Sequence, residues 1–158
     1  MSVLYVKQKV MTVTDEFTVL DEKKKPKFFV KGNLLGKKKL SIFSDEKRKE
    51  EVAEIKEQHS FGDTVYDIHI HGKKVATMKA KKSKSKPEFK VTGLHWEIKG
   101  TLFDDDFKIT KMLETVATLH KEKLSLGDSY KVKVSKDDND LPVIALVLAI
   151  DAVLYDEK

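Results

Sequence analysis

The stretch from Leu141 to Leu154 constrains the fold of this chain more than any other part of the sequence. Its apolar residues do not alternate; they cover every side of a helix, and Asp151 is the only charged residue among them. A helix that is apolar all round is enclosed by protein or lies in a membrane. The stretch is shorter than the ~20 residues that a helix needs to cross a bilayer. We therefore predict a buried helix over 141–155, about 20 Å long, around which the rest of the chain folds.

The residues around this helix fit such a position. Asn139 or Asp140 can cap its start, and Pro142 suits its first turn. The acidic run 137–140 has some likeness to a calcium-binding loop, but it lacks the central glycine and the distal glutamate, so helix capping explains it better. A buried unpaired carboxylate is costly, so Asp151 should be paired, protonated or near the mouth of the enclosing structure. We expect the mouth, because the position is close to the end of the helix.

Most of the remaining chain alternates between apolar and other residues, which is typical of half-buried strands. The clearest runs lie at 65–70, 94–99 and 130–134, and turn residues separate them from shorter runs. We count about twelve short strands by this criterion. A sheet that closes around the helix would leave no exposed strand edges. The sequence thus predicts an all-β fold, a single closed barrel of about twelve strands that encloses the C-terminal helix, in one domain over 1–158.

Parts of the chain repeat at offsets of about 61 to 65 residues, too long a period and too few copies for a solenoid. A duplicated hairpin unit within one closed sheet fits better. The matching segments are Pro26–Gly32 with Pro87–Gly93, Val52–Ile55 with Val116–Leu119, and Ser60–Asp63 with Ser125–Asp128, and Val75–Met78 is a third copy of the second unit.

The charge of the chain is carried almost entirely by lysine. There are 31 Lys+Arg against 26 Asp+Glu, a formal net charge of +5, and Arg48 is the only arginine. Recognition of base edges and phosphates relies on the planar fork of arginine, so nucleic acid is a disfavoured partner. The chain has no cysteine, which excludes disulfides, thiolate zinc sites and a cysteine nucleophile.

One segment is dense enough in lysine to suggest a binding site. Clusters of four to eight basic residues are typical of contact with anionic lipids, to which each lysine contributes roughly 1 kcal/mol. The default interpretation of the clusters is solvated loops whose charge nearby acids cancel; the functional one is a surface for anionic phospholipid headgroups or another polyanion. The candidate site residues are Lys79, Lys81, Lys82, Lys84 and Lys86, and smaller clusters lie at 23–27, 37–39 and 47–49.

A metal or catalytic site is not expected. Alternation places Asp67, His69 and His71 on one strand face, where they could hold a divalent metal. However, the sequence from His71 to Lys74 is typical of a turn, which would direct His71 away, and we interpret the face as an ordinary polar outer surface. No nucleophile elbow and no Glu/His arrangement of recognisable spacing is present. We expect no enzymatic activity, no metal and no cofactor.

Several segments of the chain together show a likeness to a known family. They are Leu4–Lys9, Phe17–Val19, the paired Ser-x-Gly-Asp turns, Gly93–Gly100 and Ala145–Leu154. In these segments and their order the chain resembles the bacterial LURP-one-related proteins. The resemblance implies the tubby C-terminal-like fold, a twelve-stranded closed barrel threaded by a hydrophobic C-terminal helix. Tubby proteins bind phosphoinositide headgroups through basic residues, but no phosphoinositide motif matches here, so no binding residue is carried over.

The functional expectation is a non-enzymatic cytoplasmic protein that binds an anionic membrane surface peripherally, or another polyanion, through its lysine-rich loops. The lysines within the apolar N-terminal stretch do not fit a signal peptide, and no transmembrane segment is expected. The alternative is a module that docks a protein partner and does not bind lipid. Binding to anionic vesicles would distinguish the two.

Overall fold

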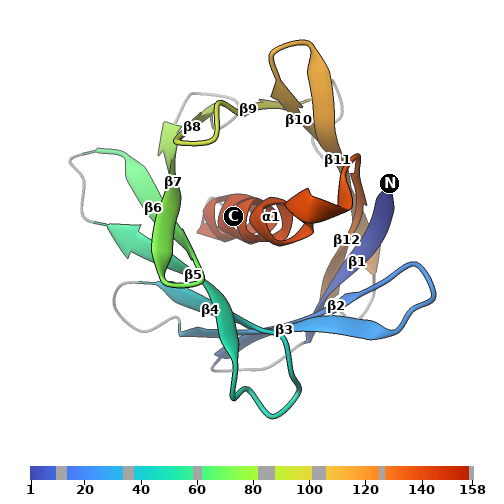
Figure 1. Cartoon of the computed structure of the whole chain (residues 1–158). Coiled ribbons are helices and arrows are strands. Elements are labelled where there is room, and N and C mark those ends of the chain that lie inside the picture. Colours follow the sequence, from blue (N-terminus) through green and yellow to red (C-terminus); the bar gives the residue numbers. More distant parts are fainter. Residues whose placement is uncertain are drawn as a thin grey trace.

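Twelve antiparallel strands form one closed barrel in the computed structural model, which describes residues 1–9, 14–33, 38–58, 62–81, 88–100, 106–124 and 127–156. Each strand pairs with its neighbours in sequence, and the first pairs with the last to close the barrel (Figure 1). The all-β barrel predicted from alternation is confirmed. The strands are β1 (Ser2–Lys9), β2 (Thr14–Leu20), β3 (Pro26–Asn33), β4 (Lys39–Phe43), β5 (Glu51–Gln58), β6 (Thr64–Ile70), β7 (Lys73–Lys81), β8 (Glu88–Thr92), β9 (Glu97–Gly100), β10 (Asp106–Lys111), β11 (Glu114–Leu124) and β12 (Gly127–Val134).

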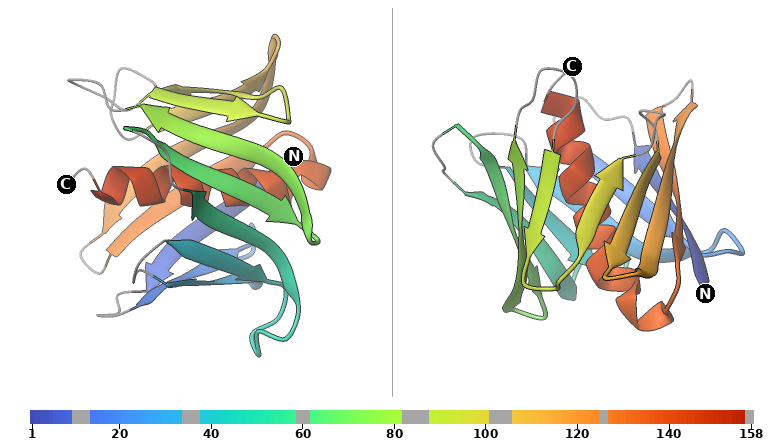
Figure 2. Two further views of the ribbon diagram at one scale, coloured as in Figure 1. Left: turned by 90° about the vertical axis from the view of Figure 1, so that its left-hand side faces the viewer. Right: turned by 90° about the horizontal axis from the view of Figure 1, so that it is seen from above.

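The predicted helix runs along the inside of this barrel. A short 3₁₀ turn, η1 (Asp137–Asn139), leads into α1 (Asp140–Asp156), with Pro142 in its first turn. Every residue from Val143 to Ile150 is at most 1% exposed, and both views in Figure 2 show strands around the helix. The buried, all-round apolar helix is therefore confirmed, and its side chains form one core with the inward faces of the strands.

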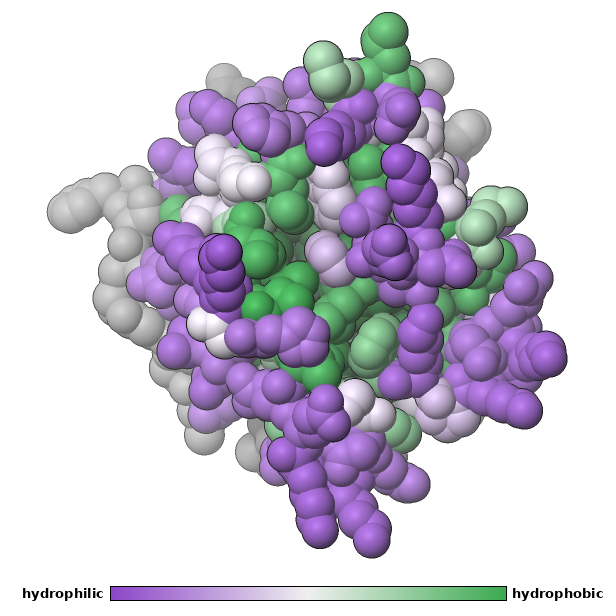
Figure 3. Space-filling model, in the orientation of Figure 1, coloured by the Kyte–Doolittle hydropathy of each residue, from purple (hydrophilic) through white to green (hydrophobic). Residues whose placement is uncertain are grey.

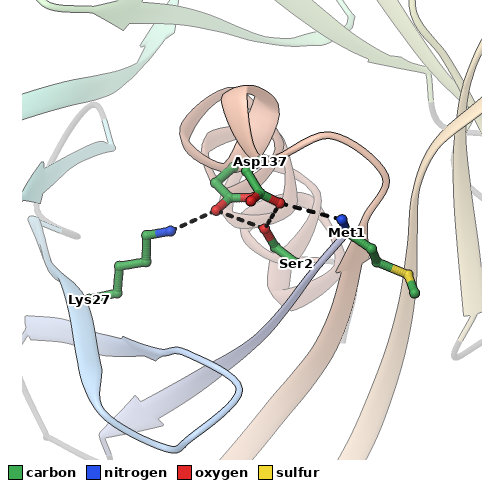
Figure 4. A network of polar contacts seen from close by, with 5 residues as sticks. Met1, Ser2, Lys27 and Asp137 are labelled. Atoms are coloured by element: carbon green, nitrogen blue, oxygen red, sulfur yellow. Dashed lines mark hydrogen bonds and ion pairs between the residues drawn. The ribbon is translucent and has the colours of Figure 1, made fainter.

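The start of the helix is tied to the N-terminal strand and to β3 (Figure 4). Ser2 Oγ donates a hydrogen bond of 2.6 Å to Asp137, and Lys27 Nζ lies 2.7 Å from the Asp140 carboxylate. The amino group of Met1 lies 3.6 Å from Asp137. The Ser2 hydrogen bond, assisted by the N-terminal charge, lowers the pKa of Asp137. Asp137, just before the helix, and Asp140, its first residue, thus join the helix to the barrel wall.

Two of the sequence matches occupy equivalent places in the barrel. The Val-Ala units of β5 and β11 are six strands apart, as are β6 and β12, which face each other across the helix in Figure 1. Tyr66 in β6 and Tyr130 in β12 are both buried. The third match joins β3 to β8, which are five strands apart, so it does not follow the same offset. The serines of the paired Ser-x-Gly-Asp turns lie outside the described residues.

One predicted strand is wrong in its first half. The alternation of Leu94, Trp96 and Ile98 predicted a strand over 94–99, but β9 begins at Glu97. Gly93 and His95 have φ of +108° and +58°, values that are incompatible with an extended strand. The chain bends there, and Trp96 turns into the core with 5% exposure.

The bend leaves β8 and β9 poorly joined. They share a single register pair, Lys90 with Glu97, whereas every other neighbouring pair shares several. The turn from β8 to β9, like those from β6 to β7 and from β10 to β11, lies at the end of the barrel where α1 begins (Figure 2). The seam between β8 and β9 is thus the weakest line of the barrel wall.

Candidate functional site

The outer face of β7, β8, β9 and β10 brings lysines directly opposite one another. Lys79 of β7 is the register partner of Lys90 of β8, and Lys99 of β9 is the partner of Lys108 of β10. Like charges directly opposite across a strand pair are destabilising. These strands face the viewer on the right of Figure 2. We call the outward side chains Lys79, Lys81, Lys90, Lys99 and Lys108 the lysine face.

Few of these charges are neutralised. Lys79 Nζ lies 3.2 Å from Asp63, and Lys99 Nζ lies 3.8 Å from Glu97. Both lysines are more than a third exposed, so each pair contributes little binding energy. Among the described residues, no carboxylate forms an ion pair with Lys81, Lys90 or Lys108. The face therefore carries a local excess of positive charge.

The structure describes only two of the five lysines predicted from the sequence to form a binding site. Lys79 and Lys81 lie on β7 as outward residues, whereas Lys82, Lys84 and Lys86 lie outside the described residues. Sequence reasoning missed Lys90, Lys99 and Lys108, because none of them has another lysine directly beside it in the sequence. The outward positions of the predicted strands contained the signal, but it becomes visible only when the strand pairing is known.

A groove lies along the weak seam between β8 and β9. It has a volume of about 520 Å³ and is lined by Lys90, His95, Glu97 and Lys99 together with Trp96 and other apolar residues. It exists because the bend before β9 separates the two strands after their single shared pair. The groove combines a charged rim with an apolar floor, an arrangement suited to an amphiphilic ligand.

A second hollow adjoins this groove at the end of the barrel. It has a volume of about 570 Å³ and lies between the β8–β9 turn, the β10–β11 turn and the residues before α1. Trp96 and Met112 line both hollows. The β10–β11 turn therefore forms a boundary between them.

The candidate metal face does not assemble. His71 has φ of +50° in the two-residue turn after β6, as the sequence indicated. Asp67 accepts a hydrogen bond of 2.9 Å from Thr77 and lies 3.3 Å from Lys74 Nζ. With 8% exposure Asp67 is buried, so our interpretation of an open polar face is wrong at this residue. The described residues contain no group of three ligands that could hold a metal ion.

A smaller hollow of about 200 Å³ lies beside His69, whose Nδ1 is buried without a hydrogen-bond partner. Glu51 and Glu54 line it as well. Burial and the neighbouring Glu54 raise the pKa of Glu51. Burial opposes ionisation of Glu54 too, but hydrogen bonds from Lys56 and Glu51 lower its pKa overall. As pH falls, Glu51 is therefore protonated before Glu54.

Asp151, close to the end of α1, is buried and paired. It is 7% exposed and accepts a hydrogen bond of 2.5 Å from Tyr130 Oη. Lys121, which also points inward and is buried, has its Nζ 5.9 Å from the centre of the Tyr130 ring. Of the alternatives that the sequence left open for Asp151, the structure shows pairing, and β12 supplies the partner through Tyr130.

A closed barrel of twelve strands filled by one apolar helix is the tubby C-terminal-like class of fold. A protein from Arabidopsis thaliana with a known X-ray structure is similar to the chain, with a TM-score of 0.61 and 16% identity over 96% of this chain and 91% of that one. The model of the family described as LURP-one-related matches residues 2–151. The uncharacterized protein YxjI of Bacillus subtilis (strain 168) is 31% identical over 155 residues, 98% of this chain and 95% of that protein. The chain belongs to the LURP-one-related family.

The comparisons and the structure both agree with the resemblance to the LURP-one-related family that the sequence shows. Within the described residues, no helix combines the length and the apolar character needed to pass through a bilayer. The likeness to the Arabidopsis protein supports the fold alone, because fold similarity is a weak guide to function. Any function must therefore be argued from the site.

Proposed function

We propose that this protein is a non-enzymatic module that binds anionic membrane surfaces peripherally through the lysine face. The observation that carries the proposal is that two pairs of lysines lie directly opposite each other across neighbouring strands, Lys79 with Lys90 and Lys99 with Lys108. Each pair opposes the stability of the sheet, and the two pairs lie on adjoining strands. An anionic surface would relieve this repulsion.

The magnitude is sufficient for reversible binding. Each lysine near an anionic bilayer contributes roughly 1 kcal/mol, so the five residues of the lysine face together correspond to a dissociation constant in the millimolar range or tighter. Lys82, Lys84 and Lys86 adjoin this face in sequence and are part of the proposal. A phospholipid bilayer is a better match than nucleic acid because the charged groups are lysines, which attract as point charges rather than through a bidentate fork.

Co-sedimentation with vesicles tests the proposal. The wild-type protein should bind vesicles that contain phosphatidylserine, bind less at higher salt because charges more than ~10 Å apart are screened at 0.1 M, and ignore phosphatidylcholine vesicles. Charge reversal in a K90E/K108E variant removes two contributions of about 1 kcal/mol, so affinity should fall by roughly 30-fold or more.

The matched control is a K7E/K31E variant. Lys7 and Lys31 are exposed lysines on β1 and β3, and β3 is six strands away from β9 in the barrel. The control changes net charge by the same amount but leaves the lysine face intact, so its affinity should stay within a few-fold of wild type. An equal loss of vesicle affinity in both variants would show that binding depends on net charge and not on the lysine face. The absence of wild-type binding to the vesicles even at low salt would refute the proposal. Co-purification of one defined protein without vesicle binding would favour a protein-docking module instead.

A further inference from the structure

The turn between β10 and β11 exposes two large apolar side chains. Met112 is 87% exposed and Leu113 is fully exposed, at 103%. Within the described residues, the only other large hydrophobic side chain this exposed is the terminal Met1. Hydrophobic atoms stand out at the top of the view in Figure 3, at the position of the β10–β11 turn in Figure 1. Isolated apolar residues on a surface need no explanation, but an adjacent pair at the tip of a hairpin does.

The backbone of this turn is unfavourable for the residues that form it. Met112 has φ of +54°, a region that glycine, asparagine and aspartate tolerate far better than methionine. The other non-glycine residues with positive φ in the part of the chain that the structure describes are Lys24, Arg48, His71 and His95, all of them polar. The equally short β6–β7 turn uses His71 followed by a glycine, which suits its geometry. Met112 therefore departs from both the conformational and the polarity preference of a hairpin turn.

The position of the turn connects it with the lysine face. In Figure 1 the β10–β11 hairpin projects outward beyond β8 and β9, and in the right view of Figure 2 the same strands lie on the side that carries the lysine face. Lys111 immediately precedes the turn, and Lys108 lies on the same strand. A flat anionic surface laid against β8, β9 and β10 would meet the projecting tip as well as the lysines.

We propose that Met112 and Leu113 insert into the acyl boundary of the bilayer while the lysine face contacts the headgroups. This inference rests on the proposed function, and it adds a specific anchor and a depth of contact to it. Apolar side chains combined with basic ones are the two ingredients of peripheral binding at a membrane interface. The projecting shape of the tip and the positive charge beside it together favour an anionic bilayer over a protein pocket.

The absence of cysteine from the chain allows a direct test. An L113C variant and an H71C control, each labelled with the environment-sensitive dye NBD, place one probe on each of two short hairpin turns. With phosphatidylserine-containing vesicles, the dye at 113 should show a several-fold rise in emission, a blue shift, and quenching by lipids with a nitroxide on the acyl chain. The dye at 71 should show none of these changes.

A second variant keeps the test independent of labelling. M112N/L113G places asparagine, which tolerates positive φ far better than methionine, at position 112, so it should fold about as stably as wild type in a urea titration. Its affinity for the same vesicles should nevertheless fall by roughly tenfold or more, since burial of one such side chain is worth about that factor. The remaining binding should keep the salt dependence of the lysine face.

The outcomes separate the two proposals. If wild type does not bind the vesicles at all, both the proposed function and the anchor fail. If wild type binds but the dye at 113 is silent and M112N/L113G retains full affinity, the anchor fails and the lysine face stands alone. A dye at 113 that responds only to a protein partner would likewise overturn membrane insertion.

Discussion

Adding a single methyl group at Gly93 should damage the fold severely. This glycine has φ of +108°, and a Cβ added there would lie 2.4 Å from the carbonyl oxygen of Val75 and 3.1 Å from the Cα of Ala76. Both atoms belong to the backbone of β7, so no side-chain rotation can relieve the contact. Backbone strain at positive φ costs about 1–3 kcal/mol, and forcing a packed neighbour aside costs about 1–3 kcal/mol more. We therefore expect Gly93→Ala to destabilise the protein by about 3–5 kcal/mol.

Two other glycines provide graded controls. Gly62 has φ of +78° but no atom within 4 Å of the added Cβ, so Gly62→Ala should cost at most about 1–2 kcal/mol from the backbone alone. Gly100 has no positive φ, and its nearest neighbour would be Phe107 Cε1 at 3.8 Å, an ordinary contact. Alanine is the better strand residue, so Gly100→Ala should be neutral or stabilising by about 0.5 kcal/mol.

Urea unfolding followed by circular dichroism measures all three variants on one scale. For a domain of this size each kcal/mol also lowers the melting temperature by about 2–4 °C. The expected order of destabilisation is Gly93, then Gly62, then Gly100. A Gly93→Ala variant within about 1 kcal/mol of Gly62→Ala, a difference close to the spread of ordinary substitutions, would show that β7 yields easily, and the argument from the close backbone approach would be wrong.

Three further predictions follow from the interior and from the start of the helix. Tyr130→Phe removes a hydrogen bond to the buried Asp151 and should cost about 1.5–3 kcal/mol in urea unfolding, whereas Tyr66→Phe, whose partner is only half-buried, should cost about 1 kcal/mol or less; the reverse order would contradict the pairing. Because the folded pKa of Asp137 is lowered, its stabilising contribution is present above the unfolded pKa and is lost as pH falls through the folded pKa. An NMR titration should show this pKa rising toward its ordinary value in Ser2→Ala, and an unchanged value would exclude that hydrogen bond as the main cause. Deletion of α1 should abolish cooperative unfolding, and a truncated chain that still melted cooperatively would disprove the enclosed core.

The parts of the fold that depend on local pattern could be predicted from the sequence. Val143 to Ile150 had to be enclosed because no side of the helix was polar, and period-two alternation located most of the strands. The exception at 94–96 is instructive. Leu94 and Trp96 alternate as strand residues do, but a glycine and a histidine at positive φ fold the chain back there. Alternation reports which side chains are buried and does not report the backbone angles that bury them.

The candidate site depended on information that the sequence does not contain. Lys90, Lys99 and Lys108 gain their meaning only from the register that sets them opposite or beside other lysines, and register is a property of the paired strands. The interior partner of Asp151, Tyr130, was missed for a similar reason, as was the buried Lys121 near the Tyr130 ring. The alternation of β11 places Lys121 on the inner face, but the sequence does not indicate that the barrel encloses so long a charged side chain.

The helix that occupies the inside of the barrel follows all twelve strands in the sequence. This order affects how the protein folds during its synthesis. During synthesis β1 emerges first, yet its second partner, β12, and the helix that covers its inner face are the last of the described elements to appear. Until then the inward residues of eleven or more strands face water, and the edges of an unfinished sheet stay open. Such long-range closure makes folding slow and leaves intermediates prone to aggregation. The nascent chain should therefore form no stable partial barrel and should stay prone to aggregation until the helix is released.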